Sequence, residues 1–440
     1  MKKLKILTDP NPILRERAVP VDSFDGETQE LIDNMIYTMR QNEGVGLAAP
    51  QVGALKQIIV GEFESDDEVE DNFSLTVVIN PKIKHLSEEK VFMLEGCLSF
   101  PGKEFYIKRP KEVEISALNR WGEPIKIKNS SLLARVLQHE IDHLDGILMI
   151  DHIKIVRTIF IGNGTLGVPT LERIADDPQF KLLEVITSAP KPAGRRQELR
   201  KTAIGFTAEK LKAKVYSVDS LKDRKNINHI KTLTPEIIIL ADYNEIIPKE
   251  ILEIPKFGVL NLHPSLLPKY RGPSPIASAI LNGEKKTGVS IIKMNECVDA
   301  GDILSQLEIK IRPRETALQL KNRLAKFVAD LLAETVPYLL ADEITPIKQK
   351  EEKATTTEVL QKSDGQLFGK ETAERIDQMV RALSPWPGVY QIVGDRRIFI
   401  TKAHLDKEKK LVIDRVKPES KREMTYKEYL AGNSPLTIRK

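Results

Sequence analysis

Two histidines and a glutamate carry the strongest chemical signal in this sequence. His139 and His143 are four residues apart, so on a helix they lie one above the other on a single face. That spacing lets both imidazoles bind one metal ion, while Glu140 between them is free to act as a base. The alternative is a chance pair of surface histidines, but the chain has only 7 histidines in 440 residues. We therefore predict a metal site on a helix.

A cysteine earlier in the chain offers a third ligand. Cys97 lies in the segment 95–102, where glycines indicate a tight turn. Alone it would be interpreted as a buried structural cysteine. Beside the two histidines its thiolate completes three protein ligands, whereas structural zinc sites normally have four. Three ligands and a carboxylate predict a hydrolytic centre, in which the metal acidifies a water molecule that Glu140 deprotonates.

The apolar residues around the histidines predict the helix that positions them. Gly146 is a typical residue just past the end of a helix. A second helix is expected over residues 22–40, and the glycines and proline of residues 44–53 predict a shaped loop. Gln51 in that loop is either an ordinary turn residue or an amide donor directed at a substrate oxygen. The apolar residues with helical spacing are Leu132, Leu133, Val136, Leu137, Ile141 and Leu144.

Three segments, in this order, resemble the motifs of peptide deformylases: GVGLAAPQVG at 44–53, EGCLSFPG at 95–102 and QHEIDHLDG at 138–146. The resemblance covers about residues 2–153 and implies an α+β domain over residues 1–155. It implies hydrolysis of the formyl group from N-formylmethionyl peptides, with nascent chains near the ribosome as the expected substrates.

The same resemblance implies a role for each motif residue. Glu140 would be the acid and base, Gln51 and the backbone N–H of Leu98 would stabilise the oxyanion, and Gly46 would bind the substrate backbone. The metal is usually Fe²⁺ in the family, although the ligand set alone also accepts Zn²⁺, Ni²⁺ or Co²⁺. The implied metal ligands are Cys97, His139 and His143.

Alternating strand-like and helix-like segments begin at about residue 156 and predict an open parallel sheet. A buried strand at 158–161 leads into residues 162–167, which match a dinucleotide-binding glycine pattern. The next strand does not end in the acidic residue that such a site requires, so we interpret these glycines as a turn of the sheet. Ligands of such sheets bind at the C-terminal ends of the strands.

Residues 257–275 contain most of the candidate catalytic residues of this region. A short strand there delivers Asn261 and His263, two residues apart and therefore on the same face, and Asp299 follows beside a glycine. An amide, an imidazole and a carboxylate suit acyl transfer to an amine without a covalent intermediate. The amide stabilises the oxyanion, and the His–Asp pair takes the proton that the amine loses. Taken separately, each residue is more often structural.

The segments NLHPSLLPKYRG (261–272) and DAGD (299–302) resemble the folate-dependent formyltransferases, and the PAGR segment (192–195) resembles methionyl-tRNA formyltransferases. This implies a Rossmann-like catalytic domain over 156–342, 10-formyltetrahydrofolate as donor and initiator methionyl-tRNA as acceptor. Asn261, His263 and Asp299 would be catalytic. Arg195 and Arg196 would contact tRNA. The implied substrate-binding loop comprises Ser265, Leu266, Leu267 and Pro268.

One segment departs from this family's pattern. Within residues 242–248, Asn244 and Glu245 replace the usual glycine and apolar residue. Asparagine can adopt the left-handed conformation that glycine favours. The glutamate is expected to lie beside the pterin pocket.

The last part of the chain predicts a linker and a small domain. Residues 343–365 are polar and charged and are expected to form a linker. KSDGQLFG (362–369) and RALSPWPGVY (381–390) resemble the start of the C-terminal domain of the same formyltransferases. The resemblance implies a shortened, β-barrel-like domain of the OB type over 366–440 that binds tRNA.

Composition predicts the cellular setting. Cys97 and Cys297 are the only cysteines, too few for a disulfide framework. The N-terminus lacks the apolar stretch of a signal peptide, and no run has the length of a membrane span, so we expect a cytoplasmic protein without a membrane partner.

Residues 1–155 contain 19 Lys and Arg against 26 Asp and Glu, a net charge of −7, whereas the rest carries +11. A basic second part suits a polyanion, although a solvated surface explains it too.

These inferences predict a bifunctional enzyme that formylates initiator methionyl-tRNA and deformylates the resulting peptides. We expect no direct channelling, because ribosomal synthesis separates the two reactions. Two alternatives keep the first activity and change the second. The second half could formylate a nucleotide-linked amino sugar, since the same chemistry serves any primary amine, or it could be a catalytically inactive tRNA-binding module.

Overall fold

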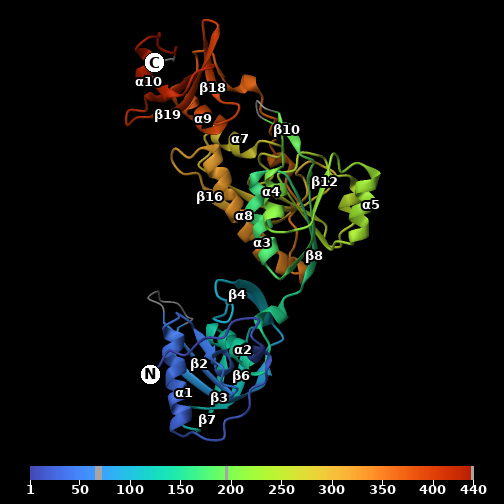
Figure 1. The fold of residues 1–440 in the computed structure, drawn as a ribbon, viewed down its shortest axis with the longest axis vertical. Helices are drawn as coiled ribbons and strands as arrows, with labels where there is room; N and C mark the ends of the chain where they lie inside the picture. Colours follow the sequence, from blue (N-terminus) through green and yellow to red (C-terminus); the bar gives the residue numbers. More distant parts are fainter. Residues whose placement is uncertain (65–71, 194–196, 438–440) are drawn as a thin grey trace. The chain divides into compact units, whose positions relative to one another are not determined.

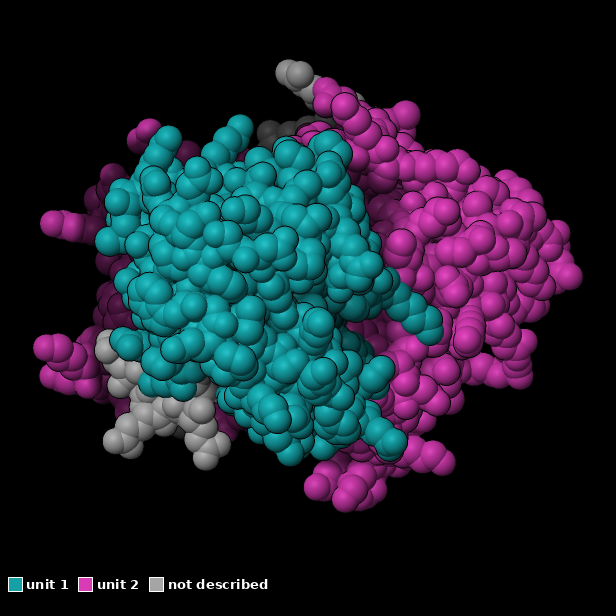
Figure 2. All heavy atoms as spheres, turned by 90° about the horizontal axis from the view of Figure 1, so that it is seen from below, with its two compact units in different colours: residues 1–154 teal, residues 155–440 magenta. Residues whose placement is uncertain are grey.

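The structure is a computed structural model that describes residues 1–64, 72–193 and 197–437. The chain forms two compact units, unit 1 over residues 1–154 and unit 2 over residues 155–440. Figure 1 shows the fold as a ribbon, and Figure 2 colours the two units separately. Each unit has its own apolar core, and we describe each by itself.

Unit 1 is built on a five-stranded antiparallel sheet in the order β1-β2-β3-β6-β7, with β4 and β5 forming a separate hairpin. Successive side chains of a strand point to opposite faces, and β2 shows this directly. Ile59 packs in the core beneath helix α2, whereas Ile58 and Val60 pack with helix α1. The sheet therefore has a helix on each face, and α2 is the helix that carries the two histidines.

The ends of these helices follow from local chemistry. Asp25 caps α1, because its carboxylate accepts a hydrogen bond from the backbone N–H of Thr28. After α2 the chain turns at Gly146, whose φ is +73° and where a Cβ atom would lie 2.5 Å from the carbonyl oxygen of Arg15. Only glycine fits that position without strain. The predicted end of the histidine helix is therefore confirmed.

The elements of unit 1 are η1 (Pro12–Arg15), α1 (Gly26–Arg40), β1 (Gly46–Ala48), η2 (Ala49–Val52), β2 (Ile58–Phe63), β3 (Phe73–Leu86), β4 (Lys90–Gly96), β5 (Glu104–Pro110), β6 (Val113–Leu118), β7 (Pro124–Asn129), α2 (Leu132–Leu144) and η3 (Met149–His152).

Unit 2 contains a seven-stranded sheet in the order β12-β9-β8-β13-β14-β15-β16. The first five strands pair in parallel, as the sequence predicts, and β15 and β16 extend the sheet with antiparallel pairing. The fold is thus an open α/β sheet with a mixed edge. Ile237 and Ile239 of β13 pack in the core with α3, α4 and α8, whereas Ile238 and Leu240 pack with α5 and α6. Helices therefore cover both faces.

A second, five-stranded sheet in the order β17-β18-β19-β20-β21 follows at the end of unit 2. It is the small C-terminal β domain that the sequence predicts. Helix α9 packs against β19 of this sheet and against α7 of the larger sheet region. Ile376 and Leu383 of α9 belong to the same apolar core as Ile280 of α7 and Leu324 of α8. The two sheets of unit 2 are therefore joined through one continuous core.

The elements of the larger sheet region are β8 (Val156–Gly162), η4 (Thr165–Gly167), α3 (Val168–Asp176), β9 (Phe180–Ser188), β10 (Lys191–Ala193), β11 (Glu198–Arg200), α4 (Ala203–Lys210), β12 (Val215–Val218), α5 (Arg224–Leu233), β13 (Ile237–Ala241), α6 (Lys249–Leu252), β14 (Val259–His263), α7 (Pro275–Leu281), β15 (Lys286–Lys293), β16 (Asp302–Lys310) and α8 (Ala317–Leu340).

The remaining elements are η5 (Glu351–Lys353), η6 (Lys362–Gly365), β17 (Gln366–Leu367), α9 (Ala373–Leu383), β18 (Val389–Val393), β19 (Arg396–Leu405), β20 (Leu411–Pro418), β21 (Met424–Thr425) and α10 (Tyr426–Leu430). Among the helices of the described residues, none combines the length and the apolar character needed to cross a membrane.

Candidate active sites

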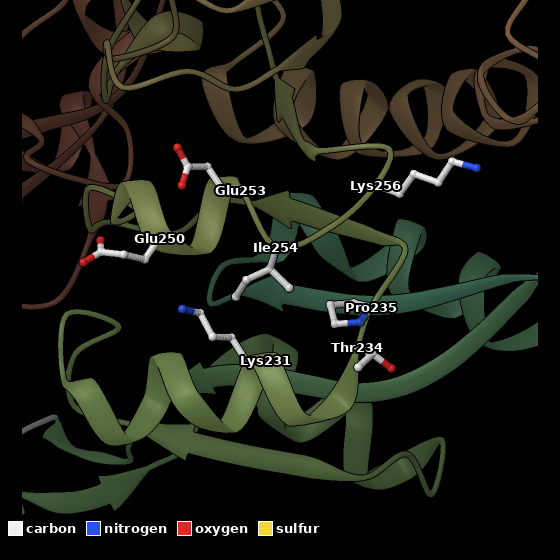
Figure 3. Close-up of a pocket in the computed structure, with 7 residues that line it drawn as sticks. All are labelled: Lys231, Thr234, Pro235, Glu250, Glu253, Ile254 and Lys256. Carbon is white, nitrogen blue, oxygen red and sulfur yellow. The ribbon is translucent and has the colours of Figure 1, made fainter.

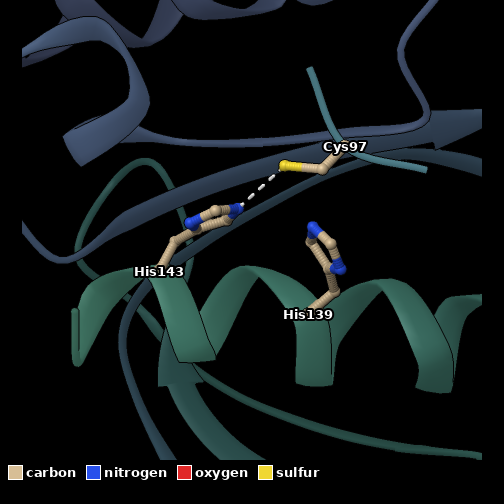
Figure 4. A group of neighbouring side chains, drawn as sticks. All are labelled: Cys97, His139 and His143. Carbon is tan, nitrogen blue, oxygen red and sulfur yellow. Dashed lines mark hydrogen bonds between the residues drawn. The ribbon is translucent and has the colours of Figure 1, made fainter. Parts of the chain in front are cut away.

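The three predicted metal ligands come together in unit 1. Cys97 follows the end of β4, and His139 and His143 lie one turn apart on α2 (Figure 4). One potential ligand atom from each of the three residues lies within 4.8 Å of the others. The thiol Sγ and Nε2 of His143 are 3.3 Å apart. This arrangement can hold one cation between a sulfur and two nitrogens.

The surroundings of the histidines fit a cation. Nδ1 of His139 hydrogen-bonds the Glu95 carboxylate at 2.9 Å, which leaves Nε2 for a metal. Burial, and then the charge of His139, holds the pKa of His143 well below its usual value, so that ring is neutral, as a ligand must be. Burial also lowers the pKa of His139, but Cys97 and Glu95 outweigh it and raise that pKa well above the usual value. Metal binding would release this proton.

Glu95 is the centre of a buried ionic network behind the metal ligands. Its Oε1 accepts hydrogen bonds from Nε of Arg109 at 2.7 Å and from Nη1 of Arg135 at 2.9 Å. Burial opposes ionisation of Glu95, but His139 and Arg109 outweigh it and lower its pKa to about 2. Arg109 also pairs with Asp142. Glu95 is therefore an anion that fixes the orientation of the His139 ring.

Glu140, the predicted proton-transfer residue, lies between the two histidines on α2. Its side chain is buried, and among the described residues its Oε2 has no hydrogen-bond partner. Burial raises its pKa to about 7, against the opposing charges of His139 and Arg109. A Cβ atom on Gly46 would come within 2.6 Å of Oε1 of Glu140. Glycine at this position therefore makes room for the carboxylate.

The predicted oxyanion donors also lie at this site. Gln51, on η2, is fully buried, and its Oε1 accepts a hydrogen bond from the backbone of Ala48 at 2.8 Å. Its Nε2 thereby points toward Cys97 Sγ at 3.5 Å and Ser99 Oγ at 3.2 Å. Leu98 follows Cys97 directly, and its side chain fills the space that a Cβ atom on Gly44 would need. The structure thus brings together every residue that the sequence assigned to this site.

The second predicted group assembles at the C-terminal end of β14 in unit 2. Asn261 and His263 are both buried on this strand, and Asp299 lies in the loop between β15 and β16. Nδ2 of Asn261 donates to Oδ1 of Asp299 at 2.9 Å, and the backbone N–H of Gly272 donates to Oδ2 at 2.7 Å. Nδ1 of His263 is 3.5 Å from that same Oδ2. The three predicted residues therefore form one connected group.

The ring of His263 is held from both sides. Its Nε2 lies 2.9 Å from the carbonyl oxygen of Tyr270 and can donate to it. The opposite nitrogen, Nδ1, faces Asp299. An imidazolium formed at this position would have a hydrogen-bond acceptor on each side, so the group is suited to accepting a proton.

The predicted substrate-binding loop follows directly. Ser265 and Leu267 are buried, and Leu266 and Pro268 are half-buried. Ser265 Oγ donates to the carbonyl oxygen of Lys269 at 2.6 Å. Leu267 packs with Ile292 and Ile303 in a small apolar cluster. The buried side chains of Ser265 and Leu267 therefore hold this loop in its conformation.

The glycine-rich turn after β8 and the departure at Glu245 also have structural roles. Oδ1 of Asn163 accepts hydrogen bonds from Thr187 Oγ1 at 3.0 Å and from the backbone of Ser188 at 2.9 Å, so it ties β8 to β9. The Glu245 carboxylate accepts hydrogen bonds from Ser220 Oγ and, at 2.8 Å, from the backbone of Leu221. Glu245 therefore links two neighbouring loops at the C-terminal edge of the sheet.

Two predicted residues cannot be placed. Arg195 and Arg196 lie outside the described residues, and the short strands β10 and β11 flank them. A hollow of about 520 Å³ in unit 2 lies away from the catalytic group, near the N-terminal ends of β13 and β14. Figure 3 shows it between the end of α5 and α6. We assign it no role in catalysis, because Asn261 and His263 lie at the other end of β14.

Sequence reasoning missed several residues that support these sites. Glu95 offered a signal, since a carboxylate two residues before a metal ligand is a candidate to orient another ligand. Ser99 lies in the same motif. Gly272 ends the segment NLHPSLLPKYRG, which was its signal, whereas Gln349 offered none, because its contact with Asp299 depends on how distant segments pack.

Three family models match the chain in succession. Polypeptide deformylase matches residues 3–158, formyl transferase matches residues 154–336, and the formyl transferase C-terminal domain matches residues 359–412. The two resemblances inferred from sequence motifs are therefore confirmed.

Curated relatives match the second unit. The methionyl-tRNA formyltransferase of Methylacidiphilum infernorum is 38% identical over 246 residues, which cover 55% of this chain and 77% of that protein. The enzyme of the same name from Bacillus cytotoxicus is 37% identical over 235 residues, covering 53% and 74%.

Solved structures match the first unit. The peptide deformylase from Ehrlichia chaffeensis is 40% identical, with 34% of this chain and 87% of that chain covered and a TM-score of 0.32. The peptide deformylase from Thermotoga maritima is 38% identical, with 35% and 99% covered and a TM-score of 0.32. The chain belongs to the methionyl-tRNA formyltransferase family, and it carries a polypeptide deformylase domain ahead of the formyltransferase.

Proposed function

We propose that the chain has two enzymatic activities. Unit 1 hydrolyses the formyl group from N-formylmethionyl peptides, and unit 2 transfers a formyl group from 10-formyltetrahydrofolate to the amino group of initiator methionyl-tRNA. The observation that carries the first activity is the Cys97–His139–His143 cluster beside the buried Glu140. The observation that carries the second is the Asn261–Asp299–His263 group at the strand ends.

In unit 1, Cys97, His139 and His143 would hold a divalent cation, which we propose to be Fe²⁺, with Zn²⁺, Ni²⁺ or Co²⁺ as substitutes. The chemistry that such a cation supplies is the acidification of a water molecule. Glu140 takes the proton of this water and later delivers it to the departing amine. Nε2 of Gln51 and the backbone N–H of Leu98 donate to the developing oxyanion.

In unit 2, the amine of the methionyl group attacks the formyl carbon of the donor. Asn261 donates from its amide to the formyl oxygen, on which negative charge develops. His263 accepts the proton that the amine loses, and Asp299 stabilises the resulting imidazolium. The bond from the formyl carbon to N10 of the folate then breaks, and N10 takes a proton. Ser265, Leu266, Leu267 and Pro268 would form the folate side of the pocket.

The curated relatives favour this acceptor over an amino sugar, because both bear the name methionyl-tRNA formyltransferase. We propose that Arg195, Arg196 and the small C-terminal sheet contact the tRNA. We further propose that the protein works in the cytoplasm, and that unit 1 meets its peptides near the ribosome.

Two assays on the full chain test these activities. Formate release from an N-formylmethionyl tripeptide, measured with anaerobically purified protein loaded with Fe²⁺, tests unit 1. Formyl transfer from 10-formyltetrahydrofolate to initiator methionyl-tRNA tests unit 2. Absence of bound transition metal, or of formyl transfer, would contradict the corresponding assignment. The expectation of no channelling fails if formylated tRNA is deformylated faster than peptides.

A further inference from the structure

Residues 347–357, which we call the strap, connect helix α8 with the small C-terminal sheet and run along the loop that follows β14. The sequence predicted a simple linker here. The backbone of Arg271 donates to the carbonyl oxygen of Thr355 at 2.8 Å, and the backbone of Thr357 donates to the carbonyl oxygen of Arg271 at 2.7 Å. A bridge between Ile347 and Ile303 fixes the other end of the strap to β16. The strap is therefore hydrogen-bonded to the catalytic part along its length.

Side chains reinforce this pairing. The guanidinium group of Arg271 is nearly buried and binds both carboxylate oxygens of Glu351, at 2.9 and 2.7 Å. Such bidentate pairs fix geometry as well as adding energy. The backbone N–H of Tyr270 donates to Thr355 Oγ1 at 2.8 Å. Both residues that precede Gly272 are thus held by the strap.

Gln349 reaches the turn that carries Asp299. Its Nε2 donates to the carbonyl oxygens of Asp299 and Gly301, each at 2.8 Å. Its Oε1 accepts from Nε of Arg271 at 3.0 Å. Its side chain is turned inward, whereas its neighbours Lys348 and Lys350 are exposed. One amide therefore links the Asp299 turn to the Arg271 loop.

The turn that Gln349 binds is strained. Asp299 has a φ of +49°, in the left-handed region that favours glycine. Non-glycine residues persist there when their surroundings hold them. The Asp299 carboxylate is bound by Asn261 and by the backbone of Gly272. The strap thus holds both the backbone of Asp299, through Gln349, and one partner of its carboxylate, through Arg271 and the adjoining Gly272.

We propose that Gln349 is a positioning residue for formyl transfer, which holds Asp299 in the conformation that serves Asn261 and His263. This inference rests on the formyl transfer proposed for the site. Gln349 touches neither reacting group and acts through the Asp299 turn. A neutral amide suits the task, because one end must donate to two carbonyl groups and the other must accept from a guanidinium.

Gln349→Ala and Gln349→Glu test this proposal in the full chain. The first removes the side chain, and the second keeps its size but directs an acceptor at two carbonyl oxygens. We expect kcat for formyl transfer to fall roughly 10-fold to 100-fold in both, because small displacements of catalytic groups are that costly. The KM values for donor and tRNA should stay near those of the parent chain. Glu352→Ala, an exposed position of the strap, is the matched control.

Two further readouts separate positioning from a general loss of structure. The deformylase activity of the same polypeptide should be unchanged in each variant. With histidine labelled by stable isotopes, the ring NMR signals of His263, identified by their loss in His263→Asn, should change position in both Gln349 variants and not in Glu352→Ala.

A kcat within twofold of the parent, a defect confined to a raised KM for tRNA, or unchanged His263 ring signals in both variants would overturn the proposal. If the parent chain transfers no formyl group, the proposed function of unit 2 fails. The His263 ring signals still decide whether Gln349 positions the Asp299 turn.

Discussion

The two catalytic groups of this chain are built in different ways. In unit 1, His139, Glu140 and His143 share one helix, and the geometry among them is set by the backbone hydrogen bonds of α2. In unit 2, Asn261 and His263 end a strand, whereas Asp299 lies in a loop and depends on a residue 50 positions later in the chain. Three residues of the first group are thus fixed by one helix, although Cys97 comes from a distant segment, whereas Asp299 in the second group is fixed mainly by contacts between distant segments.

This difference also appears in the supporting residues. The proposed metal ligands of unit 1 are supported by buried ions, with Glu95 bound to Arg109 and Arg135. Asp299 in unit 2 is supported by neutral amides, from Asn261 and the backbone of Gly272 and from Gln349. Loss of one buried ion leaves its partner's charge uncompensated, whereas loss of one amide is expected to shift a loop. The predictions below test this contrast.

The largest effect is expected from His139→Ala. Removing one of three ligands abolishes the site that acidifies water, so formate release should fall roughly 10³-fold or more. Formyl transfer by the same chain should be unaffected. Metal content and both activities are measured on one preparation. A parallel loss of formyl transfer would show that the two groups are not independent.

A smaller loss is expected from His263→Asn, which removes the group that accepts the proton. General base catalysis contributes about 10²-fold or somewhat more, so kcat for formyl transfer should fall by that factor. Deformylation should not change. Rates of formylated tRNA formation under saturating substrates provide the measurement. A variant as fast as the parent would remove His263 from the mechanism.

Glu95→Gln tests the buried ions of unit 1. It keeps the size of the side chain but removes the charge that orients His139 and pairs with Arg109. Metal affinity should fall roughly 10-fold to 100-fold, as measured by competition with a chelator. Glu89→Gln is the control, because Glu89 forms an exposed ion pair with Lys111. Equal affinities of the two variants would contradict the role of Glu95.

The smallest effect is expected from Glu245→Gln in unit 2. One carboxylate oxygen that accepts from Ser220 or Leu221 becomes an amide donor, so one hydrogen bond is lost. The free energy of unfolding should fall by about 1 kcal/mol in urea titrations. Glu250→Gln, in an exposed and long ion pair with Arg224, should change it much less. If both variants match the parent chain, Glu245 does not hold the two loops together.

The same contrast explains what the sequence could predict. The helix over 132–144 and its histidines follow from residue spacing, and the parallel strands follow from alternating patterns. The antiparallel edge of the sheet was not foreseen, because β15 has the same apolar character as the parallel strands beside it. Gln349 lies in a polar segment whose composition is that of a linker, and only tertiary packing shows that it binds the Asp299 turn.

The continuous apolar core of unit 2 has a consequence for how this protein can be divided. Leu324 of α8 and Ile376 of α9 pack in one cluster, so a chain cut between them would expose apolar surface on both fragments. The two sheets of unit 2 should therefore unfold in a single transition. Unit 1 has its own apolar core, so we expect it to fold without unit 2. A cut near residue 155 should therefore leave both parts folded, whereas removal of the small C-terminal sheet should destabilise the rest of unit 2.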